Sequence, residues 1–75
     1  MEIIPRITIE PEKMGGKACI RGYRFTVEHL LGLLAEGMKP EEIMKEWDFL
    51  EPEDFPAALR YAAYLAGERT LPLAS

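Results

Sequence analysis

The chain has 75 residues, of which 48% are hydrophobic and 29% charged, and its formal net charge is -4. A chain of this length holds one hydrophobic core, and this composition is ordinary for a folded protein, which excludes the disordered and membrane-spanning classes. We therefore expect a single domain over residues 1–75, and its small size favours a homodimer. The first residues, MEIIPRITIE, lack the basic and apolar regions of a signal peptide, so we expect a cytoplasmic protein.

Cysteine and histidine are too scarce for two common kinds of site. Cys19 is the only cysteine and His29 the only histidine, which excludes an internal disulfide and makes a structural zinc site improbable. We expect neither a metal nor another cofactor. The chain also contains no Asn and no Gln, a composition typical of proteins from thermophiles.

Residues 1–25 predict a short β ribbon and a basic, glycine-rich loop. Residues 6–10 read Arg-Ile-Thr-Ile-Glu between two prolines, an alternation typical of a half-buried strand. The next segment, PEKMGGKACIRG, holds three glycines and favours turns, and residues 23–25 could form the second strand. A ribbon of two strands is marginal in water, so it must rest on helices or join the strands of a second subunit.

Residues 26–67 predict three helices. Thr26 is a suitable N-cap for a first helix over about 27–36, and Gly37 supplies its stop. Pro40 begins a second helix that ends near Trp47 or Asp48, since proline is favoured at the first helical position. The third helix follows the sequence LEPED and should end at Gly67. The fold class is thus mainly α: a trihelical, helix-turn-helix core of the homeodomain-like kind, preceded by two short strands.

Two features of the third helix and its tail are less regular. Pro56 removes a backbone donor, so we expect the regular helix to begin near Pro56 after a looser turn, with a kink or a short 3₁₀ segment there. Phe55, Leu59, Ala62 and Ala66 form the stripe that we expect to face the core. Residues 68–75 have no helical spacing and predict an extended arm that orders on a partner.

Basic residues are concentrated near the N-terminus, although the protein is acidic. Residues 1–24 carry a net charge of +2 and the remainder carries -6. One stretch without any acid contains four basic residues, which makes it a candidate contact for phosphate or nucleic acid. The alternative is a solvated loop whose glycines only provide turns. The candidate nucleic-acid-binding residues are Lys13, Lys17, Arg21 and Arg24.

The sequence predicts a binding protein rather than an enzyme. Cys19 and His29 are the one conventional catalytic pair, but no third group or oxyanion site accompanies them. The third helix is poor in residues that read bases, because Arg60 is its only charged residue between Ala57 and Ala66. It looks instead like a helix covered on two sides. The candidate partner-binding residues are Arg60, Tyr61, Tyr64, Leu65, Leu71 and Leu73.

The chain also resembles a known family. The segments GGKACIRGYRFTV, LLAEGMKPEEI and PEDFPAALRYA, in this order, resemble the bacterial domain-of-unknown-function family 433 over residues 7–66. The resemblance implies a short antitoxin-like protein with a homeodomain-like trihelical core, often encoded beside a PIN-like ribonuclease toxin. Lys39 and Glu51 depart from the pattern because Ser or Thr is usual at these N-caps, Tyr23 replaces a smaller residue, and Pro56 interrupts helix three.

Two functions therefore stand as hypotheses. The first is an antitoxin-like protein that binds a PIN-like ribonuclease toxin and, through its basic N-terminal segment, its own promoter DNA. The second is a protein-interaction module with no DNA-binding role, which the acidic net charge and the apolar third helix favour.

Overall fold

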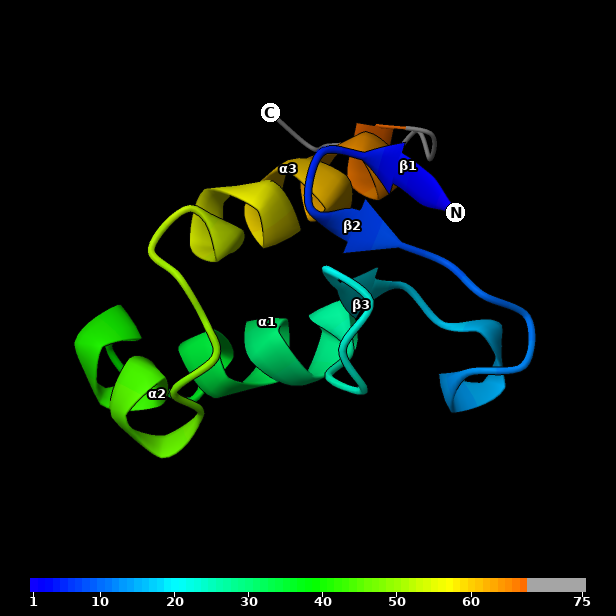
Figure 1. The fold of residues 1–75 in the computed structure, drawn as a ribbon. Helices are drawn as coiled ribbons and strands as arrows, with labels where there is room; N and C mark the ends of the chain where they lie inside the picture. Colours follow the sequence, from blue (N-terminus) through cyan, green and yellow to red (C-terminus); the bar gives the residue numbers. More distant parts are fainter. Residues whose placement is uncertain (68–75) are drawn as a thin grey trace, which may run out of the picture.

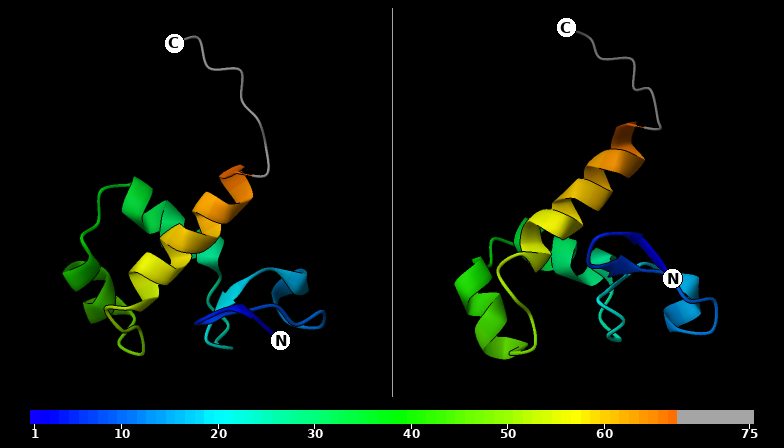
Figure 2. Two further views of the ribbon diagram at one scale, coloured as in Figure 1. Left: turned by 90° about the horizontal axis from the view of Figure 1, so that it is seen from above. Right: turned by 45° about the horizontal axis from the view of Figure 1, so that its top comes forward.

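The computed structural model describes residues 1–67, which form three helices and a small antiparallel sheet (Figure 1). The fold is mainly α, as predicted, with the sheet confined to the N-terminal part of the chain. Figures 1 and 2 show α2 at one end of the molecule and the N-terminal loops at the other. In chain order the elements are β1 (Glu2–Ile4), β2 (Ile7–Thr8), the 3₁₀ turn η1 (Met14–Gly16), β3 (Cys19–Ile20), α1 (Val27–Ala35), α2 (Pro40–Glu46) and α3 (Asp54–Gly67).

The sheet has three strands in the order β1-β2-β3 rather than the two that the sequence predicted. Within the predicted strand at residues 6–10, β2 is the paired part, and Ile7 lies opposite both Ile4 and Ile20. The predicted strand at residues 23–25 is wrong. The chain turns back on itself there, because the Ile20 carbonyl accepts from the Tyr23 N–H at 2.8 Å and the Ile20 N–H donates to the Phe25 carbonyl.

Helix α1 has the start and stop that the sequence predicted. The Thr26 hydroxyl accepts a hydrogen bond from the His29 N–H at 2.9 Å, which satisfies one of the free donors of the first turn. After the last turn, Gly37 adopts φ 98°, a left-handed conformation that glycine takes without steric cost. Val27 and Leu30 are buried, so this face of α1 packs on the core.

Helix α2 begins at Pro40. Of the two hydrogen bonds of a capping box, the clear one here runs from the backbone of the N-cap residue to a side chain in the first turn. Lys39 has no side-chain acceptor to offer, but the Glu42 carboxylate accepts from the Lys39 N–H at 2.8 Å. Ile43 is its buried residue. The unusual residue at position 39 is thus tolerated because Glu42 supplies half of the capping interaction.

Helix α3 begins at Asp54, two residues before Pro56. The proline lies in the first turn, where a missing N–H leaves no helical hydrogen bond unmade. The N–H groups of Asp54 and Phe55 donate to carbonyls three residues back, at 2.9 and 3.3 Å, which is the tighter turn expected ahead of Pro56.

The predicted core stripe of α3 is wrong at two of its four positions. Phe55 is buried and Ala62 half-buried, but Leu59 is 53% exposed and Ala66 is also exposed. The inward positions are instead Asp54, Ala58 and Tyr61. The helix is rotated in this way because the Asp54 carboxylate points into the protein toward two arginines.

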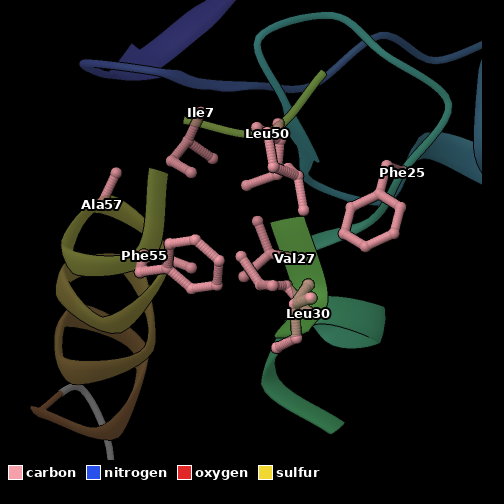
Figure 3. Packing of buried hydrophobic residues seen from close by; sticks show 10 residues of the cluster. Ile7, Phe25, Val27, Leu30, Leu50, Phe55 and Ala57 are labelled. Carbon is pink, nitrogen blue, oxygen red and sulfur yellow. The ribbon is translucent and has the colours of Figure 1, made fainter. Parts of the chain in front are cut away.

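The core lies between α1, α3 and the sheet (Figure 3). Each fully buried aliphatic or aromatic side chain contributes about 1.5–3 kcal/mol of transfer free energy, so this cluster is the main source of stability. None of the helices within residues 1–67 has both the length and the apolar character needed to cross a bilayer. The labelled members of the cluster are Ile7, Phe25, Val27, Leu30, Leu50, Phe55 and Ala57.

Candidate functional site

An apolar groove runs beneath the C-terminal half of α3. Figure 2 shows α3 packed across α1, with its C-terminal end projecting beyond the rest of the described chain. Under this end lies a hollow of about 480 Å³ between α3, α1 and the segment that follows β2. Its apolar lining comes from all three, and comprises Ile9, Ala18, Val27, Leu31, Tyr61, Ala62 and Leu65.

A second hollow of about 330 Å³ adjoins the first, on the side of the sheet. Both hollows are lined by Ile9, Tyr61 and Leu65, so they form one surface, which we call the α3 groove. The second hollow adds Ile3 and Tyr64, whose exposed fractions are 39% and 60%. Leu65 is 43% exposed. An exposed apolar surface that joins several elements in this way is typical of binding sites.

The rim of the groove carries one ion pair. The Lys17 ammonium lies 3.0 Å from the Glu28 carboxylate, and both side chains are largely exposed. The groove therefore presents an apolar floor with one charge of each sign at its edge. Such a pair contributes little to stability in water, but it can steer the orientation of a ligand.

The candidate partner-binding residues on α3 divide between two faces. Tyr61 and Leu65 line both hollows, and Tyr64 lines the smaller one. Arg60 is exposed and lines neither, so it lies away from the groove. Leu71 and Leu73 lie outside the described residues.

The four candidate nucleic-acid-binding residues do not form one free basic patch. The Lys13 ammonium donates to the Gly22 carbonyl and lies 3.6 Å from the Glu10 carboxylate. Lys17 pairs with Glu28 at the groove rim, as described above. Arg24 is exposed and makes no ion pair within residues 1–67.

Arg21, the fourth of them, is turned into the protein. Its guanidinium binds both carboxylate oxygens of Asp54, with Nη2 to Oδ2 at 2.9 Å and Nε to Oδ1 at 3.0 Å. It also donates to the Phe49 carbonyl and lies 5.1 Å from the centre of the Tyr23 ring. Three of the four basic groups are thus engaged with other parts of the same chain.

Asp54 is the buried centre of an ion-pair cluster that the sequence analysis did not predict. Its side chain is fully buried and accepts from Arg6 at 2.9 Å, from Arg21, and from the Glu51 N–H at 2.8 Å. Burial acts to raise the pKa of Asp54, but the hydrogen bonds from Arg21, from the Glu51 N–H and from Arg6 together lower it below its usual value. Hydrogen bonds to the Glu51 and Asp54 carboxylates raise the pKa of Arg6, and the hydrogen bonds to Asp54 raise the pKa of Arg21.

The two arginines reach Asp54 from turns that no sequence pattern connects. Arg6 and Arg21 both adopt left-handed backbone conformations, with φ 75° and φ 44°, and the Arg21 N–H donates to the Arg6 carbonyl at 2.9 Å. Asp54 lies 48 and 33 residues away from them in the sequence. A carboxylate at a helix start is already explained by the helix dipole, so the position of Asp54 in the sequence does not indicate an arginine partner.

Cys19 and His29 are occupied in structural contacts. Cys19 is 2% exposed, and its Sγ lies 3.5 Å from the Lys17 carbonyl. The His29 ring packs against Phe25 and Trp47, with ring centres 4.6 and 5.3 Å away. No group of three or more His, Cys, Asp or Glu side chains within the described residues is placed to hold a metal ion.

Comparison with known proteins gives one match. The family DUF433, a protein family of unknown function, matches residues 7–62, which is most of the chain. Searches among curated proteins and among solved structures found no significant match.

Proposed function

Since the chain belongs to the DUF433 family, whose function is unknown, we propose that it is an antitoxin-like protein that acts by binding a PIN-like ribonuclease toxin in the α3 groove. The observation that carries the proposal is the apolar surface shared by Tyr61, Tyr64 and Leu65. The partner is named from the resemblance described above, and the location of its binding site rests on the geometry.

The physical support is the free energy available from covering this surface. Burial of apolar area contributes roughly 25 cal/mol per Å², and Ile3, Tyr64 and Leu65 each keep over a third of their surface exposed. Tyrosines at the centre of an apolar patch are frequent anchors of protein interfaces, since they bury much area at a low cost in side-chain entropy. Leu71 and Leu73, which follow α3 in the sequence, belong to the proposed interface as further apolar anchors.

The test uses two leucines of the same helix. The chain is co-expressed with the PIN-like ribonuclease encoded beside its gene, and affinity is measured by calorimetry together with cleavage of a fluorogenic RNA. We expect Leu65→Glu, in the groove, to weaken binding at least about tenfold and to restore cleavage. Leu59→Glu is the matched control, because Leu59 is equally apolar but lies outside both hollows.

Three results would contradict the proposal. One is that no PIN-like ribonuclease gene adjoins the gene for this chain. A second is that the ribonuclease and the chain do not form a complex. A third is that Leu59→Glu weakens the complex as much as Leu65→Glu, which would move the contact away from the groove.

A DNA-binding role is the second part of the antitoxin proposal, and one observation supports it. Arg24 is exposed and has no ion pair among the described residues, and Lys17 pairs only with an exposed carboxylate, so both could contact phosphates. The helix-turn-helix description is less favoured, because residues 47–53 separate α2 from α3 whereas such motifs use turns of about three to four residues.

The alternative is an interaction module with no role on DNA. Anisotropy of the chain's own upstream DNA across a salt series separates the two, since phosphate contacts give a log-log dependence of affinity on salt. The variant should be Lys17→Ala/Arg24→Ala, because Arg21→Ala would also remove the partner of Asp54. Salt-dependent DNA binding by the wild type that the variant loses supports the DNA role. If the chain binds no DNA, either alone or in complex with the ribonuclease, the interaction module is supported instead.

A further inference from the structure

The outward face of α3 is as apolar as the face that packs on the protein. Six exposed positions lie on this outward side of the helix, and among them only Arg60 is charged. A helix at the surface of a monomer normally turns charged and polar residues to water, whereas a helix that is apolar on all sides is covered on all sides. The six positions are Pro56, Leu59, Arg60, Ala63, Tyr64 and Gly67.

These positions are arranged symmetrically along the helix. They form pairs about the midpoint between residues 61 and 62, so that Leu59 corresponds to Tyr64 and Arg60 to Ala63. When two copies of α3 pack antiparallel about a two-fold axis at this midpoint, each residue faces its counterpart in the other copy. The long Arg60 side chain then meets the small Ala63, and Pro56 meets Gly67. The face is therefore complementary to itself in both size and direction.

Charge favours contact at this face over other parts of the surface. Each copy carries a net charge of -4, so two copies repel when their acidic regions approach. The outward face of α3 has no carboxylate, and it adds only the positive Arg60. Two acidic chains can thus approach there without bringing carboxylates together.

We infer that a second copy of this chain packs antiparallel on the outward face of α3, and that the protein is a two-fold symmetric homodimer through this helix. The helix is about 21 Å long at 1.5 Å per residue, so the contact is smaller than the roughly 800 Å² per partner of a standard interface. The dimer is accordingly weak. Among the six residues of this face only Tyr64 also lines the groove, so the dimer contact lies mainly outside the groove and the inference goes beyond the proposed function.

Sedimentation equilibrium of the full chain tests the dimer, from about 1 to about 500 µM protein. We expect the weight-average mass to rise toward twofold with concentration, and more steeply at high salt because screening reduces the repulsion between acidic copies. Ala63→Glu should stay monomeric. Ala35→Glu is the matched control, an exposed alanine on α1, and it should dimerise like the wild type. Circular dichroism confirms that both variants fold.

Cross-linking tests the position of the axis. In the antiparallel dimer, residue 63 of one copy and residue 63 of the other are offset along the helix axis by three residues, or about 4.5 Å. This offset is compatible with a disulfide between two cysteines at this position. We expect Ala63→Cys to form a covalent dimer on mild oxidation and Ala35→Cys to remain monomeric, with Cys19 buried in both. A monomeric wild type at the highest concentration, a dimeric Ala63→Glu, or equal cross-linking at positions 35 and 63 would overturn the inference. None of these outcomes depends on the ribonuclease.

Discussion

The Arg21 guanidinium holds the buried Asp54 carboxylate by both of its oxygens, at 2.9 and 3.0 Å. This contact joins the turn after β3 to the first turn of α3, two segments that share no strand pairing. Arg6 binds the same carboxylate from the turn between β1 and β2. Asp54 therefore fixes how α3 lies against the sheet, and with it the shape of the groove.

Removing the carboxylate should destabilise the fold strongly. Asp54→Ala leaves two arginines without their common acceptor, and breaking a buried ion pair costs about 3–5 kcal/mol. We expect a loss at or just below this range in urea unfolding, because both arginines remain partly exposed. The control is Glu53→Ala, an exposed neighbour whose loss should cost under about 0.5 kcal/mol. Equal effects of the two substitutions would refute the assigned role.

Acid should remove the same interaction. The pKa of Asp54 is lowered on folding, so its contribution to stability is present in full above the unfolded value of about 3.9 and is lost as pH falls through the folded pKa. The arginines stay charged throughout this window. We expect the urea midpoint of the wild type to fall more steeply below about pH 4 than that of Asp54→Asn. Parallel pH profiles for the two proteins would show that Asp54 does not titrate in this way.

Lysine should not replace Arg21. Only the planar guanidinium can bind both oxygens of Asp54 and still reach the Phe49 carbonyl. We expect Arg21→Lys to reduce the free energy of unfolding by about 1–2 kcal/mol. Arg24→Lys is the matched substitution at an exposed arginine and should change it by less than about 0.5 kcal/mol. Thermal unfolding of both variants at neutral pH measures the difference.

Two glycines should respond to alanine with opposite signs. Gly32 lies inside α1, and an added Cβ there would meet no atom within 4 Å, so Gly32→Ala should stabilise the protein by about 0.5–1 kcal/mol. Gly37 has φ 98°, where a side chain strains the backbone, so Gly37→Ala should destabilise it by about 1 kcal/mol or more. Urea unfolding of both variants is the measurement, and a stabilising Gly37→Ala would contradict this assignment.

The helices were predictable because their signals are local. Thr26 and Gly37 set the ends of α1 through hydrogen bonds with residues three positions away, and Pro40 begins α2 through its fixed backbone conformation. The third strand was not predictable. Cys19 and Ile20 pair with β2 across the irregular segment 9–18, and no local signal in their own residues marks that pairing.

The sequence by itself determined the number and approximate bounds of the helices, the absence of an internal disulfide, and the apolar character of α3. Tertiary structure decided which way α3 faces. The buried Asp54 lies at the inner side of the helix, so Leu59 points outward and Tyr61 inward, against the expectation from hydrophobic spacing alone. It also engaged Arg21, a candidate nucleic-acid-binding residue, in a half-buried ion pair with Asp54. The reason is physical: an ion pair between residues far apart in the sequence forms only when the whole chain brings the two charges together.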